Sequence, residues 1–185
     1  IVPSTHNMLG GSAYKPGDIL TAYNGKTIEV LNTDAEGRLI LADALAYASK
    51  QYDPEYMLDF ATLTGAVVVT LGHIATGLMS NNDTLVENIK VSSDNTGEHV
   101  WQLPLWEEYC DQVKSDVADV KNLGSPGQAG TIAGAAFLKA FVGKDIPWAH
   151  FDVAGTSYHV ENRSYIQKNS ASGQVIRLVL DLLGA

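Results

Sequence analysis

Short apolar runs alternate along this chain with segments of helical periodicity, and this alternation constrains the fold more than any other feature. Residues 56–61 and 148–154 have the length and composition of buried strands. Residues 132–142 are apolar or small nearly all round, which predicts a buried helix. Another predicted helix, which ends before Asp53-Pro54, carries four residues on one face: Leu41, Leu45, Ala48 and Tyr52. The pattern predicts an α/β fold with a mixed, largely parallel sheet flanked by helices.

Two shorter motifs predict local geometry. Asn24-Gly25 lies between two short runs with strand propensity and predicts a two-residue hairpin turn. Asp83 is the predicted N-cap of the helix that follows it. No linker-like stretch divides the sequence, so residues 1–185 are predicted to belong to one domain.

The composition argues against several classes of protein. Twelve Lys and Arg against 21 Asp and Glu give a net charge of −9, which disfavours nucleic acid and anionic lipid as partners and is compatible with bound cations. No apolar run approaches the ~20 residues of a membrane-spanning helix. The single Cys110 cannot form an internal disulfide, which fits a reducing compartment and predicts a cytoplasmic location.

Residues 32–39 carry the densest set of chemical groups in the chain. In an extended backbone Asp34, Glu36 and Arg38 would point to the same side, because side chains alternate along a strand. Helical periodicity begins directly afterwards, so these groups are expected near a helix N-terminus, which favours anions. Two carboxylates beside a guanidinium suggest a site for a cation and an anion. On spacing alone, a solvated or locally ion-paired turn is the favoured interpretation.

The same eight residues, Asn-Thr-Asp-Ala-Glu-Gly-Arg-Leu, match the signature octapeptide of the leucyl (cytosol) aminopeptidase family. Five further blocks follow the family pattern and order: residues 16–27, 61–66, 101–105, 118–122 and 148–155. The chain therefore resembles the C-terminal part of that family's catalytic domain over residues 1–185. The resemblance implies a zinc-exopeptidase-like, three-layer α/β domain.

The resemblance also implies a function, a metal centre and a set of partners. It implies a two-metal aminopeptidase that releases N-terminal, Leu-like residues from peptide substrates, in a cytoplasmic homohexamer. The two divalent ions would be zinc or manganese, with magnesium as a further candidate. Asp34 and Glu36 resemble metal ligands, with Glu36 bridging both ions. Arg38 resembles the catalytic residue that holds a bicarbonate-like anion for proton transfer.

Five further residues resemble the family's substrate-binding positions. Backbone groups of Thr62, Leu63 and Gly65 would pair with the peptide and line the pocket for its first side chain, and Ala154 and Ser157 match other positions of that pocket. Considered without the resemblance, the same positions are also explained by tight packing at a sheet edge.

One part of the family pattern has no match in this chain. The family's upstream block supplies a Lys and two Asp ligands and a second Lys, but only 33 residues precede Asp34, and none of them forms that block. Lys15 and Asp18 belong instead to a Pro-Gly-Asp turn. The chain starts without a Met or a signal peptide, as though it continued a preceding strand. These features predict an N-terminally truncated domain.

Electrostatics makes the missing block important. Two dications about 3.7 Å apart repel each other by about 18 kcal/mol at an effective dielectric constant of about 20. Asp34 and Glu36 supply about half of the negative charge needed to offset that repulsion. We therefore expect the isolated chain to bind at most one ion, weakly, and not to hydrolyse peptides.

Other functions have weaker support in the sequence. The five histidines (His6, His73, His99, His150 and His159) lack the spacing of metal ligands, and His150 is expected to be a hydrogen-bonded core residue. The Gly-rich residues 124–130 lack the Lys and spacing of a phosphate loop, and no nucleophile elbow occurs. A non-catalytic assembly or DNA-accessory module, and a generic α/β domain with a coincidental motif, are the alternatives.

Overall fold

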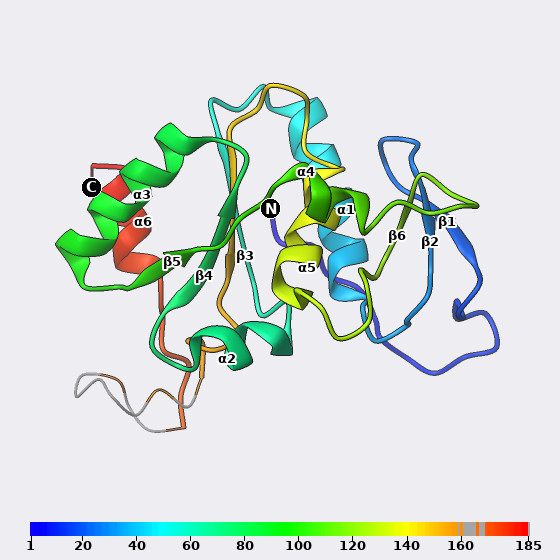
Figure 1. Cartoon of the computed structure of the whole chain (residues 1–185), viewed down its shortest axis with the longest axis horizontal. Helices are drawn as coiled ribbons and strands as arrows, with labels where there is room; N and C mark the ends of the chain where they lie inside the picture. The colour runs from blue at the N-terminus through cyan, green and yellow to red at the C-terminus, as the bar shows by residue number, and fades with distance from the viewer. Residues whose placement is uncertain (159, 161–165, 167–168, 185) are drawn as a thin grey trace. The chain divides into compact units, whose positions relative to one another are not determined.

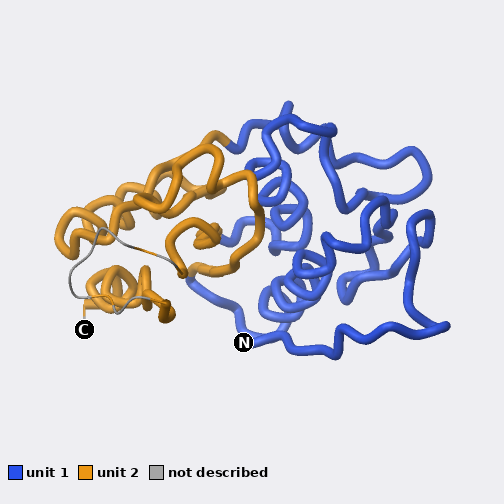
Figure 2. Tube along the Cα trace, turned by 90° about the horizontal axis from the view of Figure 1, so that it is seen from below, with its two compact units in different colours: residues 1–55, 105–146 blue, residues 56–104, 147–185 orange. Residues whose placement is uncertain are grey.

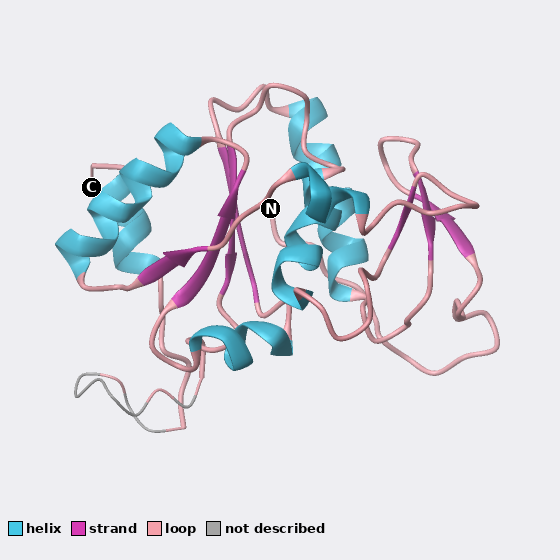
Figure 3. Ribbon diagram, viewed as in Figure 1, coloured by secondary structure: helices cyan, strands magenta, loops and turns pink. Residues whose placement is uncertain are grey.

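The computed structural model describes residues 1–158, 160, 166 and 169–184 (Figure 1). The chain forms two compact units, each built from two separate stretches of sequence (Figure 2). Unit 1 comprises residues 1–55 and 105–146, and unit 2 comprises residues 56–104 and 147–185. Each unit combines a sheet with helices (Figure 3), so the predicted α/β class is confirmed.

Unit 1 is a small three-stranded sheet with three helices. The sheet order is β1-β2-β6, with β1 and β2 antiparallel and β2 and β6 parallel. The elements of the unit are β1 (Ile19–Thr21), β2 (Thr27–Glu29), α1 (Gly37–Gln51), α4 (Glu107–Asp111), β6 (Val120–Lys121) and α5 (Gly130–Lys139). Helix α5 is buried from Thr131 to Leu138, as its apolar sequence predicts. Close packing explains one loop glycine, because a Cβ at Gly124 would lie 2.6 Å from the Cβ of Ala133.

The predicted hairpin is confirmed, but its turn has three residues instead of two. Thr21 pairs with Thr27, and the Ala22 N–H donates to the Lys26 carbonyl at 2.8 Å. The loop therefore consists of residues 23–25, and Gly25 at its end has φ +88°. A glycine with positive φ closes a three-residue hairpin loop without steric cost, so Asn-Gly serves this turn as well as the shorter one.

Unit 2 is built on a four-stranded mixed sheet of order β3-β7-β4-β5. Its pairs β3-β7 and β4-β5 are parallel, and β4-β7 is antiparallel. The elements of the unit are β3 (Met57–Ala61), α2 (Gly65–Leu71), β4 (Thr76–Ser80), α3 (Asp83–Thr96), β5 (Val100–Gln102), β7 (Trp148–Asp152) and α6 (Ile176–Leu182). The mixed, largely parallel sheet predicted from the sequence is therefore present.

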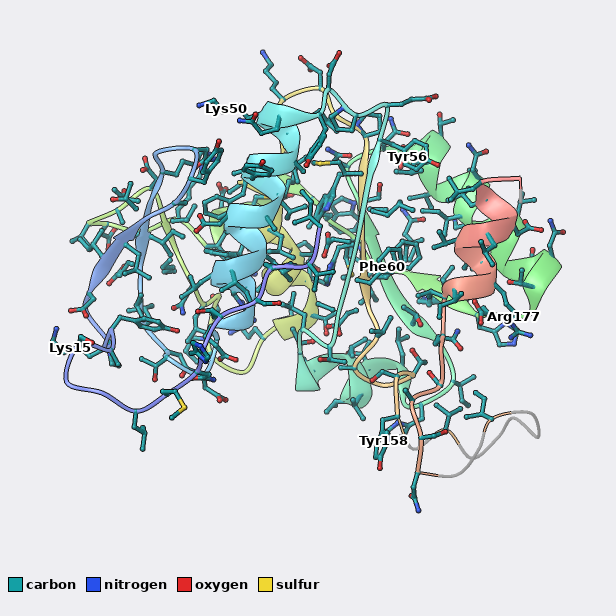
Figure 4. All side chains as sticks on the ribbon, turned by 180° about the vertical axis from the view of Figure 1, so that it is seen from behind. Lys15, Lys50, Tyr56, Phe60, Tyr158 and Arg177 are labelled. Atoms are coloured by element: carbon teal, nitrogen blue, oxygen red, sulfur yellow. The ribbon has the colours of Figure 1, made fainter. Side chains whose placement is uncertain are left out.

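Helices α3 and α6 lie together against one face of this sheet (Figure 1). Residues from both helices and from strands β4 and β7 share one apolar core: Leu78, Leu85, Val86, Ile89, Ala149, Phe151, Val175 and Leu178. Phe60, labelled in Figure 4, stacks on Phe151 with ring centroids 4.7 Å apart. Arg177, at the start of α6, donates from Nε to the buried Glu98 carboxylate at 3.2 Å.

No helix in the described part of the chain has the length and hydrophobicity to cross a membrane.

Two predicted helix details are wrong. The buried face of α1 includes Leu39, Ala42 and Leu45, whereas Tyr52, predicted to lie on that face, follows the helix and is 62% exposed. The N-cap of α3 is Asn82, whose Oδ1 accepts from the Leu85 N–H at 2.8 Å. Asn caps as well as Asp does, and Asp83 in the first turn still interacts favourably with the helix dipole.

A buried polar cluster joins the neighbouring parallel strands β3 and β7 of unit 2. The Asp59 carboxylate on β3 accepts from Trp148 Nε1 at 2.7 Å and pairs with His150 Nδ1 at 2.6 Å, both on β7. His150 is fully buried, so its prediction as a hydrogen-bonded core residue is confirmed. The carboxylate satisfies two ring N–H groups that would otherwise be costly to bury.

Removal of this carboxylate should destabilise the fold. We expect Asp59→Ala to lower the free energy of unfolding by about 2–4 kcal/mol, because it leaves two buried ring nitrogens without their acceptor. Asp59→Asn keeps one acceptor oxygen and should cost less. Urea denaturation followed by tryptophan fluorescence measures both, and an alanine variant within about 0.5 kcal/mol of wild type would contradict the role assigned to Asp59.

Candidate metal and substrate site

The signature segment is a turn that leads into a helix, and the predicted extended conformation is wrong. Asn32 Oδ1 accepts from the Asp34 N–H at 2.9 Å, and its carbonyl accepts from the Ala35 N–H at 3.3 Å. Glu36, the N-cap of α1, has φ −77° and ψ −34°. An Asn side chain that bonds the backbone two residues on imitates a turn, and this bond competes with strand geometry.

The three residues predicted to form the metal and anion site nevertheless lie close in sequence to one helix N-terminus. Asp34 is exposed, Glu36 is half-buried at the N-cap, and Arg38 is 7% exposed in the first turn of α1. The prediction that they sit near a helix N-terminus is confirmed. The positive end of the α1 dipole favours the two carboxylates and also favours a bound anion.

Arg38 is held by a residue of unit 1 far away in sequence. Its Nη1 donates to the main-chain carbonyl of Asn122 at 3.2 Å, in a buried position. This bond uses one of the five N–H donors of a guanidinium. Arg38 therefore has a fixed place beside the N-terminus of α1.

Tyr14 lies beside these groups and was not predicted. Its hydroxyl donates to the Thr33 carbonyl at 3.5 Å. Partial burial raises the pKa of Tyr14 above its ordinary value, and the negative charge of Glu36 raises it further. No spacing pattern links Tyr14 to the signature segment, so only the fold could reveal it.

Lys15 and Asp18 pair with each other in the neighbouring Pro-Gly-Asp turn. The ammonium group of Lys15, labelled in Figure 4, lies 2.5 Å from Asp18 Oδ1. Hydrogen bonds from the Lys15 side chain and then from its backbone hold the pKa of Asp18 below its usual range. These two residues neutralise each other.

The predicted substrate-binding residues lie in unit 2 and are grouped by one buried carboxylate. Asp152 accepts from the Leu63 N–H at 3.1 Å, the Thr64 hydroxyl at 2.6 Å and the Ala154 N–H at 3.2 Å. Asp152 is fully buried at the end of β7. It therefore connects the turn after β3 with the turn after β7.

The remaining predicted substrate residues flank the same two turns. Thr62 is exposed after β3, Gly65 opens α2, and the Ser157 N–H donates to the Val153 carbonyl at 2.8 Å. Tight packing also occurs here, because a Cβ at Gly155 would clash with the Gly72 carbonyl oxygen. Tight packing and a role in substrate binding are therefore compatible interpretations of these turns.

The assignment of Asp34 and Glu36 as metal ligands stays a prediction. Within residues 1–158, 160, 166 and 169–184, no three His, Cys, Asp or Glu side chains form a group that could hold a metal ion. His159 lies outside the described residues. Carboxylate oxygens are suitable donors for divalent cations, so Asp34 and Glu36 fit part of a metal centre.

Comparison with known proteins agrees with this architecture. Residues 1–180 match the catalytic domain of the cytosol aminopeptidase family. A probable cytosol aminopeptidase of Desulfotalea psychrophila is 54% identical over 99% of this chain and 36% of its own length. One from Cenarchaeum symbiosum is 51% identical over 99% of this chain and 38% of its length. The structure of a mutant of tomato leucine aminopeptidase superposes with a TM-score of 0.87 at 46% identity, and the match covers 95% of this chain and 33% of that one.

The mixed sheets, the flanking helices and the carboxylate-bearing turn at the N-terminus of α1 define an α/β protein of the leucine aminopeptidase fold. The chain belongs to the cytosol aminopeptidase family. It spans about a third of the length of the relatives that it matches.

The proximity of Tyr14 and Glu36 can be tested by titration. Glu36→Gln should lower the pKa of Tyr14, because the carboxylate disfavours a nearby phenolate. Burial is the larger cause, so the pKa should stay above the ordinary value of about 10. The tyrosine ¹³Cζ resonance measures this pKa, and the exposed Glu55→Gln is the control for net charge. An unchanged Tyr14 pKa in Glu36→Gln would show that the two groups are not neighbours.

The same raised pKa has a consequence for stability. Because the folded-state pKa of Tyr14 lies above the unfolded-state value, its stabilising contribution is present below about pH 10 and is lost as the pH rises through the folded-state pKa. Glu36→Gln narrows the gap between the two pKa values, so it should lose less stability than wild type at alkaline pH. Urea denaturation at about pH 8 and about pH 11 measures this loss in both proteins.

Asp152 can be tested by hydrogen exchange. Asp152→Ala should speed exchange of the Leu63 and Ala154 amides by at least about tenfold, because both lose a buried acceptor. Asp94→Ala, an exposed change in the same unit, should leave both amides protected. Equal exchange in the two variants would mean that Asp152 does not organise these turns.

Proposed function

We propose that the protein containing this chain is a metal-dependent aminopeptidase that releases N-terminal, Leu-like residues from peptides. The observation that carries the proposal is the family match across residues 1–180, with the signature segment at the N-terminus of a long helix. The relatives are named cytosol aminopeptidases and leucine aminopeptidase. A cytoplasmic, homohexameric protein is part of the same proposal.

In this proposal Asp34 and Glu36 hold divalent ions, zinc or manganese with magnesium as a further candidate. When bound, such ions polarise the scissile carbonyl group and lower the pKa of a water nucleophile. Glu36 at the N-cap is anchored by the backbone of α1, which limits the positions its carboxylate can take. Asp34 is positioned by the turn that Asn32 closes.

Arg38 holds a bicarbonate-like anion in the proposed mechanism. Its guanidinium is buried and held by the Asn122 carbonyl, and the planar, permanently charged guanidinium group suits a planar anion. The N-terminus of α1 adds a favourable field for that anion. Arg38 would thereby hold the anion where it could carry a proton from the nucleophilic water to the leaving amine.

The turns held by Asp152 bind the peptide in the proposed function. Thr62, Leu63 and Gly65 follow the end of β3, so they lie outside the paired part of that strand. Ala154 and Ser157 are half-buried small residues, which leave room for the first side chain of a substrate. Backbone pairing with an extended peptide supplies affinity, and the pocket supplies specificity.

The 185-residue chain alone is proposed to bind at most one divalent ion, weakly, and to have no peptidase activity. Two carboxylates offset only part of the repulsion between two dications. Isothermal calorimetry with Mn²⁺ should detect a weak site in the wild-type chain and none in Glu36→Ala, while Glu55→Ala behaves as wild type. Metal binding that is absent in all three, or unchanged in Glu36→Ala, would contradict the ligand assignment.

Activity is tested in the complete gene product supplied with Mn²⁺ or Zn²⁺. Hydrolysis of a leucyl chromogenic amide should fall at least about 100-fold in Glu36→Ala, because a metal ligand is lost. The isolated 185-residue chain should show no turnover under the same conditions. Robust turnover by the isolated chain would contradict its proposed inactivity, and an inactive complete product would contradict the aminopeptidase assignment.

A further inference from the structure

Asn122 forms hydrogen bonds both with the backbone that leads into the signature segment and with Arg38 within it. It is fully buried on the stretch that follows β6. Its Oδ1 accepts from the N–H groups of Leu31 at 2.8 Å and Asn32 at 3.3 Å, and its Nδ2 donates to the Asn32 carbonyl at 2.7 Å. Its main-chain carbonyl accepts from Arg38, and its N–H donates to the Glu29 carbonyl at 3.0 Å.

These bonds connect the two residues of unit 1 that are proposed to bind a metal ion and an anion, Asp34 and Arg38. Through Asn32, the amide of Asn122 reaches the turn that positions Asp34, since Asn32 Oδ1 accepts from the Asp34 N–H at 2.9 Å. Through its own carbonyl, Asn122 reaches the guanidinium of Arg38. Asn122 therefore links the backbone turn that carries Asp34 to the guanidinium of Arg38.

We propose that Asn122 is a positioning residue that preorganises Asp34 and Arg38 for metal and anion binding. The proposal rests on the proposed function, because it assigns Asn122 a role at that same site. A buried side chain with both an acceptor and a donor is required, because Asn122 satisfies two backbone N–H groups and one backbone carbonyl of the segment that leads into the site. Only an amide of this length supplies both at once.

The neighbouring Asp119 has a different task and provides a matched control. Its Oδ2 accepts from the N–H and the hydroxyl of Thr27, each at 2.7 Å, and these bonds hold the pKa of Asp119 below its usual range. It thus fastens the start of β6 to the start of β2, without a described contact to residues 31–38. A loss of β6 anchoring in general would appear in an Asp119 variant as well as in an Asn122 variant.

The test uses hydrogen exchange and Mn²⁺ affinity of the 185-residue chain. Asn122→Ala should speed exchange of the Leu31 and Asn32 amides by at least about tenfold and weaken Mn²⁺ binding by at least about tenfold. Asn122→Gln keeps the amide donor and acceptor on a side chain one methylene group longer, so it is the milder change and should show about a threefold loss of affinity. Asp119→Ala should expose the Thr27 amide and leave the Mn²⁺ affinity unchanged.

The outcomes separate this inference from the proposed function. If Glu36→Ala abolishes Mn²⁺ binding but neither Asn122 variant weakens it, Asn122 does not position the site, and the ligand assignment survives. If Asp119→Ala weakens binding as much as Asn122→Ala does, the effect is general loosening of β6, and the inference fails. If Glu36→Ala and both Asn122 variants leave binding unchanged, the ligand assignment fails and the inference fails with it.

Discussion

Backbone groups that are buried outside regular secondary structure need side-chain partners, and this requirement organises the proposed metal-binding turn of unit 1 and the proposed peptide-binding turns of unit 2. In unit 1 the partner is the amide of Asn122, and in unit 2 it is the carboxylate of Asp152. Both side chains are fully buried. Each one serves a turn that no strand or helix would hold by itself, and each turn contains residues with a proposed role in catalysis.

Much of the fold could be predicted from the sequence because burial follows local periodicity. The strands β3 and β7 and the buried helix α5 correspond to apolar runs that are visible in the local sequence. Errors occur where two local solutions have similar energies. Asn82 and Asp83 are both good N-caps, and Asn-Gly closes hairpin loops of two or three residues. Tertiary packing decides between such alternatives.

The site was less predictable, for two physical reasons. The conformation of residues 32–36 depends on the Asn32 side chain, which bonds its own turn and overrides the strand geometry expected for Asp34 and Glu36. The residues that hold the site are remote in sequence. Asn122 is 91 positions from Leu31, and Asp152 is 89 positions from Leu63. No spacing rule reaches that far, so the identity of the site came from the resemblance and its supporting residues came from the structure.

The energies involved show which part of the proposed metal centre this chain can set by itself. A helix N-terminus stabilises a nearby carboxylate by about 0.3–1 kcal/mol, which is enough for Glu36 and Asp34 to remain beside α1 without a cation. Repulsion between two dications is larger by more than tenfold. Hydrogen bonds from Asn122 and Asn32 can therefore hold the backbone turn that carries Asp34, but the charge needed for a second ion has to come from groups other than the two carboxylates. In the proposed enzyme, the residues that hold the turn with Asp34 in place are therefore different from the residues that complete the negative charge around two metal ions.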